Sequence, residues 1–253
     1  MIFYKFVLIL KRGEFMKITI IDFNVKNDIK KKNYDGGKFP ERLSRLIRGY
    51  HVNVVCLQEV NDNYKNKLKK FLPDFNFYGD NRFKKNSPWY KRCNENNSII
   101  TNLEVTEDRT YPLAHRSKQG KRSFFSIFPR IATLVKLSNG LTIINTHLDH
   151  LSNIARKRQL EYLKQIVREN KNSPIILTGD FNLNTNDEIF EDFVIFMEAC
   201  GSKLVPIETN TYKGAGNLWN PDHVFVPKKC KILNFQILDT ALSDHRLILL
   251  EIE

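Results

Sequence analysis

The residues best suited to catalysis stand where one apolar segment ends. Residues 174–177 (PIIL) are apolar, and Thr178-Gly179-Asp180-Phe181-Asn182 follows at once. Such a run is typical of a buried strand, and its polar residues mark the point where the strand leaves the core. A carboxylate and an amide two residues apart can ligate a hard metal ion or orient an attacking water molecule. Asp180 and Asn182 are therefore the first candidates for chemistry.

Further polar residues stand at the ends of other predicted strands. Three more strands finish in a potential ligand or base, and two late strands begin just after one. If the late strands run antiparallel to the others, all these ends meet at one rim, where ligands bind in sheets of this kind. Carboxylates gathered there repel one another, and a divalent, oxygen-seeking cation relieves that repulsion. The residues concerned are Asn24, Glu59, His147, Asp222, Asp244 and His245.

Structural explanations compete with the catalytic one at each of these positions. The carboxylates could be salt-bridged, the histidines could lie in the core or in a turn, and asparagine readily forms turns and caps. Glu59 and Asp180 favour the catalytic interpretation, because an unpaired carboxylate at the end of an apolar strand is costly. Three residues near the predicted strand ends could bind substrate or form surface ion pairs: Arg130, His150 and Arg156.

The candidate side chains are positioned mainly by strands, and the predicted strands outnumber the predicted helices. Apolar and β-branched runs predict the strands, apolar residues at helical spacing predict the helices, and Ser152 is a suitable N-cap. Hairpins and strand–helix–strand units both occur, which favours an α/β (α+β) fold of packed mixed β-sheets with helices outside. We expect strands at 17–24, 53–59, 98–101, 123–128, 130–137, 141–147, 174–179, 223–226, 232–237 and 246–252 and near Thr211, helices at 39–50, 62–72, 152–170 and 187–200, and a long loop at 79–97.

The composition predicts one globular domain over residues 17–253. The 253 residues are 42% hydrophobic, which is enough for a sizeable core, and no Pro/Gly/Ser-rich linker divides them. The apolar run near the N-terminus is too short to span a bilayer and lacks a signal-peptide cleavage site. Residues 11–14 back-translate to a purine-rich run resembling a ribosome-binding site, so we expect residues 1–16 to be an upstream extension or a misassigned start.

The net charge predicts an anionic partner. The formal charge is +12, and basic stretches lie at 26–38, 82–92 and 116–122. Such stretches are either solvated loops or substrate contacts, and the second interleaves aromatic residues as nucleic-acid grooves do. The four cysteines are too widely spaced for a zinc site or a disulfide framework, which predicts a reduced, cytoplasmic protein. The shortness of the N-terminal apolar run predicts that the protein has no stable membrane insertion.

Four short motifs resemble one known group of enzymes. In chain order they are Leu57-Gln58-Glu59, Thr146-His147-Leu148, Gly179-Asp180-Phe181-Asn182 and Ser243-Asp244-His245. This ordered set is similar to that of the endonuclease/exonuclease/phosphatase superfamily, which includes deoxyribonuclease I, exonuclease III, neutral sphingomyelinases and inositol polyphosphate 5-phosphatases. The resemblance extends from about Lys17 to Glu253 and implies a four-layer sandwich of two packed mixed β-sheets flanked by helices.

The resemblance also implies a metal and a water-activating residue. Asn24 and Glu59 match positions that hold Mg²⁺, for which Mn²⁺ can substitute, against the scissile phosphate, and Asp244 matches the carboxylate on the metal side. Asp180 matches the carboxylate that orients or deprotonates the attacking water, and Asn182 matches the amide that fixes it.

The phosphate side of the site is implied in the same way. His245 matches the histidine that contacts the phosphate, with Asp222 as its carboxylate partner, although the superfamily usually has an apolar residue where Pro221 precedes Asp222. His147 resembles a second histidine of the deoxyribonuclease I and sphingomyelinase branches. Arg130 matches a phosphate-contacting arginine.

These matches predict a Mg²⁺-dependent phosphoesterase. The charge and the expected location favour a nuclease that hydrolyses phosphodiester bonds of nucleic acid. The alternatives are a phosphodiesterase or phosphatase for a small molecule or lipid headgroup, and a nucleic-acid-binding member that has lost catalysis. The 5-phosphatase branch is disfavoured, because no segment resembles its Cys-Asp-Arg motif.

Overall fold

The computed structural model describes residues 17–26, 38–114, 119–214 and 219–253. The predicted extension at 1–16 and most of the first basic stretch lie outside the described residues, as do residues 116–118 of the third.

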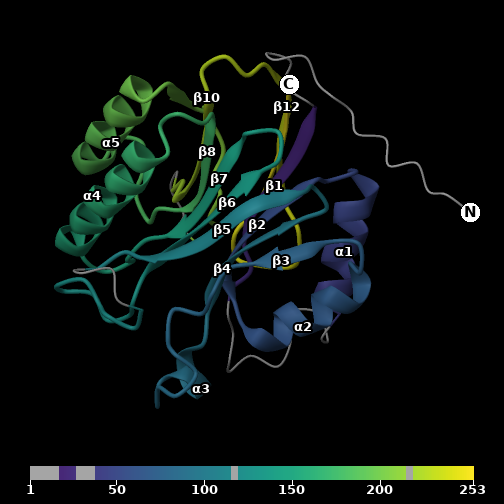
Figure 1. The fold of residues 1–253 in the computed structure, drawn as a ribbon, viewed down its shortest axis with the longest axis horizontal. Helices are drawn as coiled ribbons and strands as arrows, with labels where there is room; N and C mark the ends of the chain where they lie inside the picture. The colour runs from purple at the N-terminus through teal and green to yellow at the C-terminus, as the bar shows by residue number, and fades with distance from the viewer. Residues whose placement is uncertain (1–16, 27–37, 115–118, 215–218) are drawn as a thin grey trace, which may run out of the picture.

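Two six-stranded mixed β-sheets pack face to face (Figure 1). The first has the strand order β11-β12-β1-β2-β4-β3, and the second has the order β5-β6-β7-β8-β10-β9. The first sheet comprises β1 (Ile18–Asn24), β2 (Val54–Val60), β3 (Asn76–Tyr78), β4 (Asn96–Thr101), β11 (Ile232–Leu238) and β12 (Leu247–Ile252), and the second comprises β5 (Val105–Pro112), β6 (Ile131–Leu137), β7 (Thr142–His147), β8 (Ile175–Asp180), β9 (Ser202–Leu204) and β10 (Asp222–Pro227).

Helices cover the outer faces of both sheets, which makes four layers. Successive strand residues point to opposite faces, so Ile20 of β1 packs between the sheets while Ile21 packs toward α1 (Phe39–Gly49) and α2 (Asp62–Phe71). On the second sheet, Leu177 packs with side chains of α4 (Asn153–Glu169) and α5 (Glu188–Ala199). The predicted fold class, two packed mixed β-sheets flanked by helices, is therefore confirmed.

The strand directions bring the polar strand ends together. β1 runs parallel to β2, and β7 runs parallel to β8. β12 is antiparallel to β1, and β10 is antiparallel to β8. The carboxyl ends of β1, β2, β7 and β8 therefore share a rim with the amino ends of β10 and β12.

Buried amides fix one sheet against the other just below this rim. Gln58 Nε2 donates to Asp22 Oδ1 (2.7 Å) and to Asn145 Oδ1 (2.8 Å), and Asn145 Nδ2 donates to the carbonyls of Leu57 (3.0 Å) and Ser98 (2.8 Å). Burial holds the pKa of the Asp22 carboxyl well above its usual range. These bonds join β2 to β7, so the positions of Glu59 and His147 are coupled.

The secondary-structure predictions fail at one aromatic loop, at one polar edge strand and at several short elements. Residues 123–128 form turns instead of the predicted strand. The strand that pairs with β6 is β5, which escapes prediction because its residues 106–109 are polar and exposed at a sheet edge. The strands β3 and β9 and the helix α3 (Tyr90–Cys93), which lies in the expected loop, were also not predicted. Near Thr211, the described residues form an isolated bridge between Tyr212 and His245 in place of the predicted strand.

Candidate active site

Asp180 lies at the centre of the rim, buried at the end of β8. Asn24 Nδ2 donates to Asp180 Oδ2 (2.9 Å), and the backbone N–H of Asn182 donates to Asp180 Oδ1 (2.9 Å). The Nε2 atoms of His147 and His245 lie 3.7 and 3.8 Å from the same Oδ2. Asp180, on the second sheet, therefore accepts a hydrogen bond from the amide of Asn24 on β1 and lies close to the imidazoles of His147 and His245.

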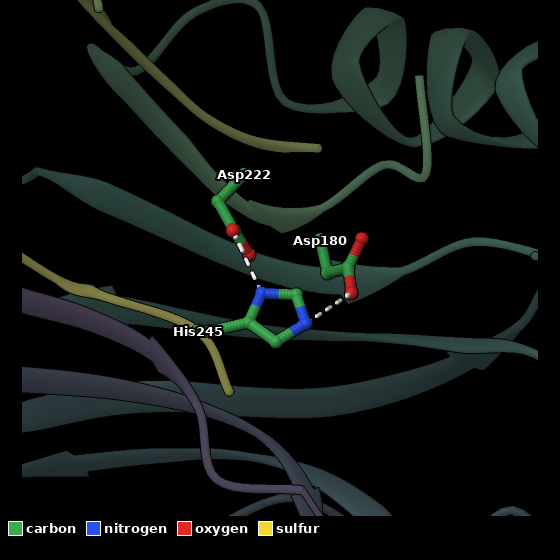
Figure 2. A group of neighbouring side chains, drawn as sticks. All are labelled: Asp180, Asp222 and His245. Carbon is green, nitrogen blue, oxygen red and sulfur yellow. Dashed lines mark hydrogen bonds and ion pairs between the residues drawn. The ribbon is translucent and has the colours of Figure 1, made fainter. Parts of the chain in front are cut away.

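His245 and Asp222 form a buried hydrogen-bonded pair (Figure 2). His245 Nδ1 donates to Asp222 Oδ2 at 2.8 Å, and its Nε2 points toward Asp180. Burial alone would lower the pKa of His245, but the charge and hydrogen bond of Asp222 raise that pKa to about 10. The imidazole is therefore a cation at neutral pH.

Asp180 and His147 are shifted toward their neutral forms. Burial, and then the charge of Asp222, raise the pKa of Asp180 to about 7. Burial, and then the charge of Arg130, lower the pKa of His147 well below its ordinary value. The rim therefore holds a carboxylate able to take up a proton near neutral pH beside one charged and one neutral imidazole.

Of the three residues expected to hold a metal, Asn24 and Glu59 contact each other, whereas Asp244 is paired with a lysine. Asn24 Nδ2 donates to Glu59 Oε1 (3.3 Å), and the Glu59 backbone has a φ of 59°, an uncommon conformation for this residue type. Asp244 is nearby in sequence to His245, but its carboxylate is ion-paired with the Lys26 ammonium. Lys26 was not singled out from the sequence, although it stands two residues after Asn24 at the start of the first basic stretch.

The donor set fits a divalent, oxygen-seeking cation. Glu59, Asp180 and Asp222 bring several carboxylate groups to one rim, and Asp222 Oδ1 is buried without a hydrogen-bond partner among the described residues. Ligand atoms of Asp180, Asp222 and His245 lie within 4.8 Å of one another, but the charged His245 donates a proton within this group and is a poor ligand. The oxygen atoms of Asn24 and Glu59 are the better match to such a cation.

The three predicted substrate-binding residues lie around the loop that follows β7. Arg130 is buried, and its Nη2 contacts Nδ1 of the exposed His150 at 3.0 Å. Arg156 Nη1 donates to the carbonyl of Asp149 (2.8 Å), so it supports this loop instead of facing away. Asn182 Nδ2 donates to the carbonyl of Leu148 (3.1 Å).

One aromatic contact was missed by the sequence analysis. The Tyr212 ring packs edge-on against the His245 ring with 5.2 Å between centroids, and the two residues form a β-bridge. No local pattern identifies this contact, since the residues are far apart in the chain.

Two packed mixed sheets with acids, amides and imidazoles on a shared rim define the class of four-layer sandwich hydrolases of phosphoric esters. The chain belongs to the Endonuclease/Exonuclease/phosphatase family, whose model matches residues 23–245. Enzymes of this family hydrolyse phosphoric esters and generally depend on a divalent metal ion. A search of curated proteins finds no significant match.

Several solved structures share the fold of this chain although their sequence identity to it is low. An endonuclease/exonuclease/phosphatase family protein from Bacteroides thetaiotaomicron has a TM-score of 0.80 and 18% identity, covering 94% of this chain and 97% of that one. A mannosyl-6-phosphatase from B. thetaiotaomicron VPI-5482 has a TM-score of 0.79 and 19% identity, with 93% and 99% covered. TDP2 of D. rerio, solved with a single-strand DNA product, has a TM-score of 0.68 and 18% identity, with 94% and 99% covered.

None of the described helices combines the length and apolar character that a membrane crossing requires.

Proposed function

We propose that this enzyme is a Mg²⁺-dependent nuclease that hydrolyses phosphodiester bonds, with Mn²⁺ as a possible substitute ion. The observation that carries the proposal is the position of Asp180, which lies within reach of two imidazoles and an amide on a rim that fits a divalent cation. Phosphate-ester hydrolysis needs an aimed water, neutralised phosphate oxygens and help for the leaving oxygen.

Asp180 is the residue we assign to the attacking water. Its carboxylate has a pKa of about 7 because burial and Asp222 raise it, which suits a base that works near neutral pH. Asn182 is anchored to both Asp180 and the Leu148 carbonyl, and we assign its amide to holding the same water.

His245 is the residue we assign to the phosphate. Asp222 holds its ring in place and keeps it charged, so that Nε2–H donates to a phosphate oxygen or to the leaving oxygen. We assign the neutral His147 to a second phosphate contact on the other side of Asp180. Arg130, with His150 and Arg156, would bind a phosphate of the substrate next to the one that is hydrolysed.

Asn24 and Glu59 would hold the divalent ion, with Asp244 on the metal side. When bound, this ion supplies charge neutralisation to the phosphate oxygens. The ion pair between Asp244 and Lys26 means that Lys26 competes for the same carboxylate.

Nucleic acid is the substrate that the charge favours. The chain carries a formal net charge of +12, and polyanions are attracted by such a surface. The alternative is a small-molecule or lipid phosphoester, for which the structural similarity to a mannosyl-6-phosphatase is the specific support.

A panel of substrates tests the proposal. The protein would be incubated with supercoiled plasmid, single-stranded DNA, RNA and bis(p-nitrophenyl) phosphate, with Mg²⁺ or with EDTA. We expect strand cleavage that EDTA abolishes. Hydrolysis of the small ester alone would replace the nuclease assignment with the small-molecule alternative, and no turnover on any substrate would favour a binding protein.

A further inference from the structure

A large hollow lies beside the loop that leads into β6. It has a volume of about 460 Å³ and is lined by Phe124, Phe125, Tyr162, Arg122 and Arg158, with two serines. The guanidinium of Arg158, on α4, lies 5.3 Å from the centroid of the Phe124 ring. An aromatic wall with an arginine laid over it is a surface on which a flat, electron-rich ring stacks.

The two phenylalanines of this hollow are largely exposed to solvent. Phe124 and Phe125 are each 61% exposed, and their rings meet edge to face at 4.4 Å. Phe125 has a φ of 67°, a left-handed conformation that bulky residues rarely adopt. Backbone strain that presents an aromatic ring to solvent is a sign of function.

A second hollow adjoins the first and shares one residue with it. Its volume is about 230 Å³, and Trp89, Phe83, Ile127, Phe128 and Arg122 line it. Trp89 is 57% exposed. Arg122 therefore stands between two aromatic hollows, and none of the described residues that line either one is acidic.

Both hollows are connected to the catalytic rim through contacts between neighbouring side chains. Ser126, at the first hollow, donates to Asp149 Oδ2 (2.6 Å), and Asp149 precedes His150, which contacts Arg130. At the second hollow, the guanidinium of Arg82 lies 4.6 Å from the Phe128 ring centroid. Arg82 lines a narrow gap together with Glu95, Arg130 and His147. His147 Nε2 in turn lies 3.7 Å from Asp180 Oδ2.

We propose that these two hollows bind unpaired bases of single-stranded nucleic acid, with Arg122 contacting the phosphate between them, on the strand that enters the active site. This inference rests on the proposed nuclease function. The two hollows are concave and carry arginines, which suits stacked bases joined by a phosphate, whereas the flat surface of a bilayer does not fill them. Bases in a duplex are stacked on each other and do not enter such hollows.

Binding without cleavage tests this proposal directly. The full-length protein in EDTA would be titrated into a fluorescein-labelled oligothymidylate of about twelve nucleotides, and into an abasic oligonucleotide of the same length. We expect the wild type to prefer the oligothymidylate. The double variant Phe124→Ala/Phe125→Ala, and separately Trp89→Ala, should weaken oligothymidylate binding roughly fivefold to a hundredfold, with little change for the abasic strand.

Matched variants separate this surface from general effects. Phe71→Ala removes another exposed aromatic side chain (42% exposed) on α2, and Arg45→Ala removes an exposed arginine on α1; neither should change binding. Arg122→Ala should weaken binding of both strands, because it removes a phosphate contact. All variants should keep the wild-type rate on bis(p-nitrophenyl) phosphate if that ester is a substrate.

The outcomes also distinguish this proposal from the nuclease assignment. Equal affinity for the two oligonucleotides, or unchanged binding by the aromatic variants, overturns the base-binding surface even if the enzyme cleaves DNA. Aromatic-dependent binding to phosphatidylglycerol/phosphatidylcholine vesicles, with unchanged oligothymidylate binding, assigns the surface to a membrane instead. Base-dependent binding by a protein that cleaves no nucleic acid supports the surface and contradicts only the proposed nuclease function.

Discussion

Asp222 influences two ionisable groups at once. Its charge raises the pKa of its hydrogen-bonded partner His245, and it also raises the pKa of Asp180 after the larger effect of burial. One carboxylate therefore helps to keep the imidazole protonated and Asp180 able to accept a proton near neutral pH.

Loss of the Asp180 carboxylate or of the His245 imidazole should strongly reduce turnover. In Asp180→Asn the base is lost, and in His245→Ala the charged donor is lost, so the rate on any ester substrate should fall on the order of 10²- to 10⁴-fold. Asp180→Asn should unfold at a similar temperature to the wild type, because it removes a buried charge beside Asp222. A variant that keeps more than about a tenth of the wild-type rate would contradict its assigned role.

The Asp222→Asn variant should shift the whole pH profile of kcat/KM toward lower pH. Asp180 must be ionised, which sets the acidic limb near its pKa of about 7, and His245 must be protonated, which sets the alkaline limb near its pKa of about 10. Asp222 raises both pKa values, so its loss lowers both.

The control for this profile is Asp74→Asn, which neutralises an exposed carboxylate that is paired with Arg48 and is not among the residues of the catalytic rim. This variant should leave both limbs of the profile in place. An alkaline limb that does not move in Asp222→Asn would show that His245 does not act in its charged form.

At the scale of elements, the pairing of β7 with β8 places His147 beside Asp180. The parallel register sets His147 opposite Asp180 and Thr146 opposite Gly179. Gly179 has a φ of +140°, and a Cβ atom built there would lie 2.0 Å from the Thr146 carbonyl oxygen. Only glycine permits this close approach of the two strands.

Gly179→Ala should therefore destabilise the protein by more than about 2 kcal/mol, because the strands must separate or the backbone must change. Urea denaturation would measure this change. Gly49→Ala is the matched control: the added Cβ meets nothing within 4 Å at the end of α1, and alanine is the better helix former, so stability should stay the same or rise by up to ~1 kcal/mol. Equal stability of the two variants would show that the strands separate at little cost.

At the scale of the whole molecule, positive charge should control cleavage of a polymer more than cleavage of a small ester. The net charge is +12, and lysines near the second hollow, Lys84 and Lys85, are exposed. Arg82 is different: it is buried and ion-paired with Glu95, so it supports the loop and is not available to substrate in this conformation.

The variant Lys84→Glu/Lys85→Glu should weaken cleavage of nucleic acid and flatten the dependence of log kcat/KM on log salt concentration, since fewer counterions are released on binding. Lys228→Glu/Lys229→Glu makes the same charge change on exposed residues after the carboxyl end of β10, opposite the catalytic rim, and should change the slope less. If the two variants have the same slope, the loop at 82–92 does not contact the substrate.

Much of the fold follows from local patterns in the sequence. Apolar strands such as β8 are buried on both faces, and amphipathic helices such as α4, which Ser152 caps through the Ala155 N–H, have strong local signals. The edge strand β5 and the turns at 123–128 were mispredicted, because exposed polar residues carry little strand signal and aromatic residues in a loop resemble a strand.

The sequence by itself determined which side chains stand at strand ends and, through its motifs, the enzyme family. Only the tertiary structure decided which atoms meet there: the His245–Asp222 hydrogen bond, the Lys26–Asp244 ion pair and the aromatic hollows around Arg122. The physical reason is that strand and helix signals arise from neighbours in the chain, whereas these contacts depend on strand register and loop packing between residues far apart in it.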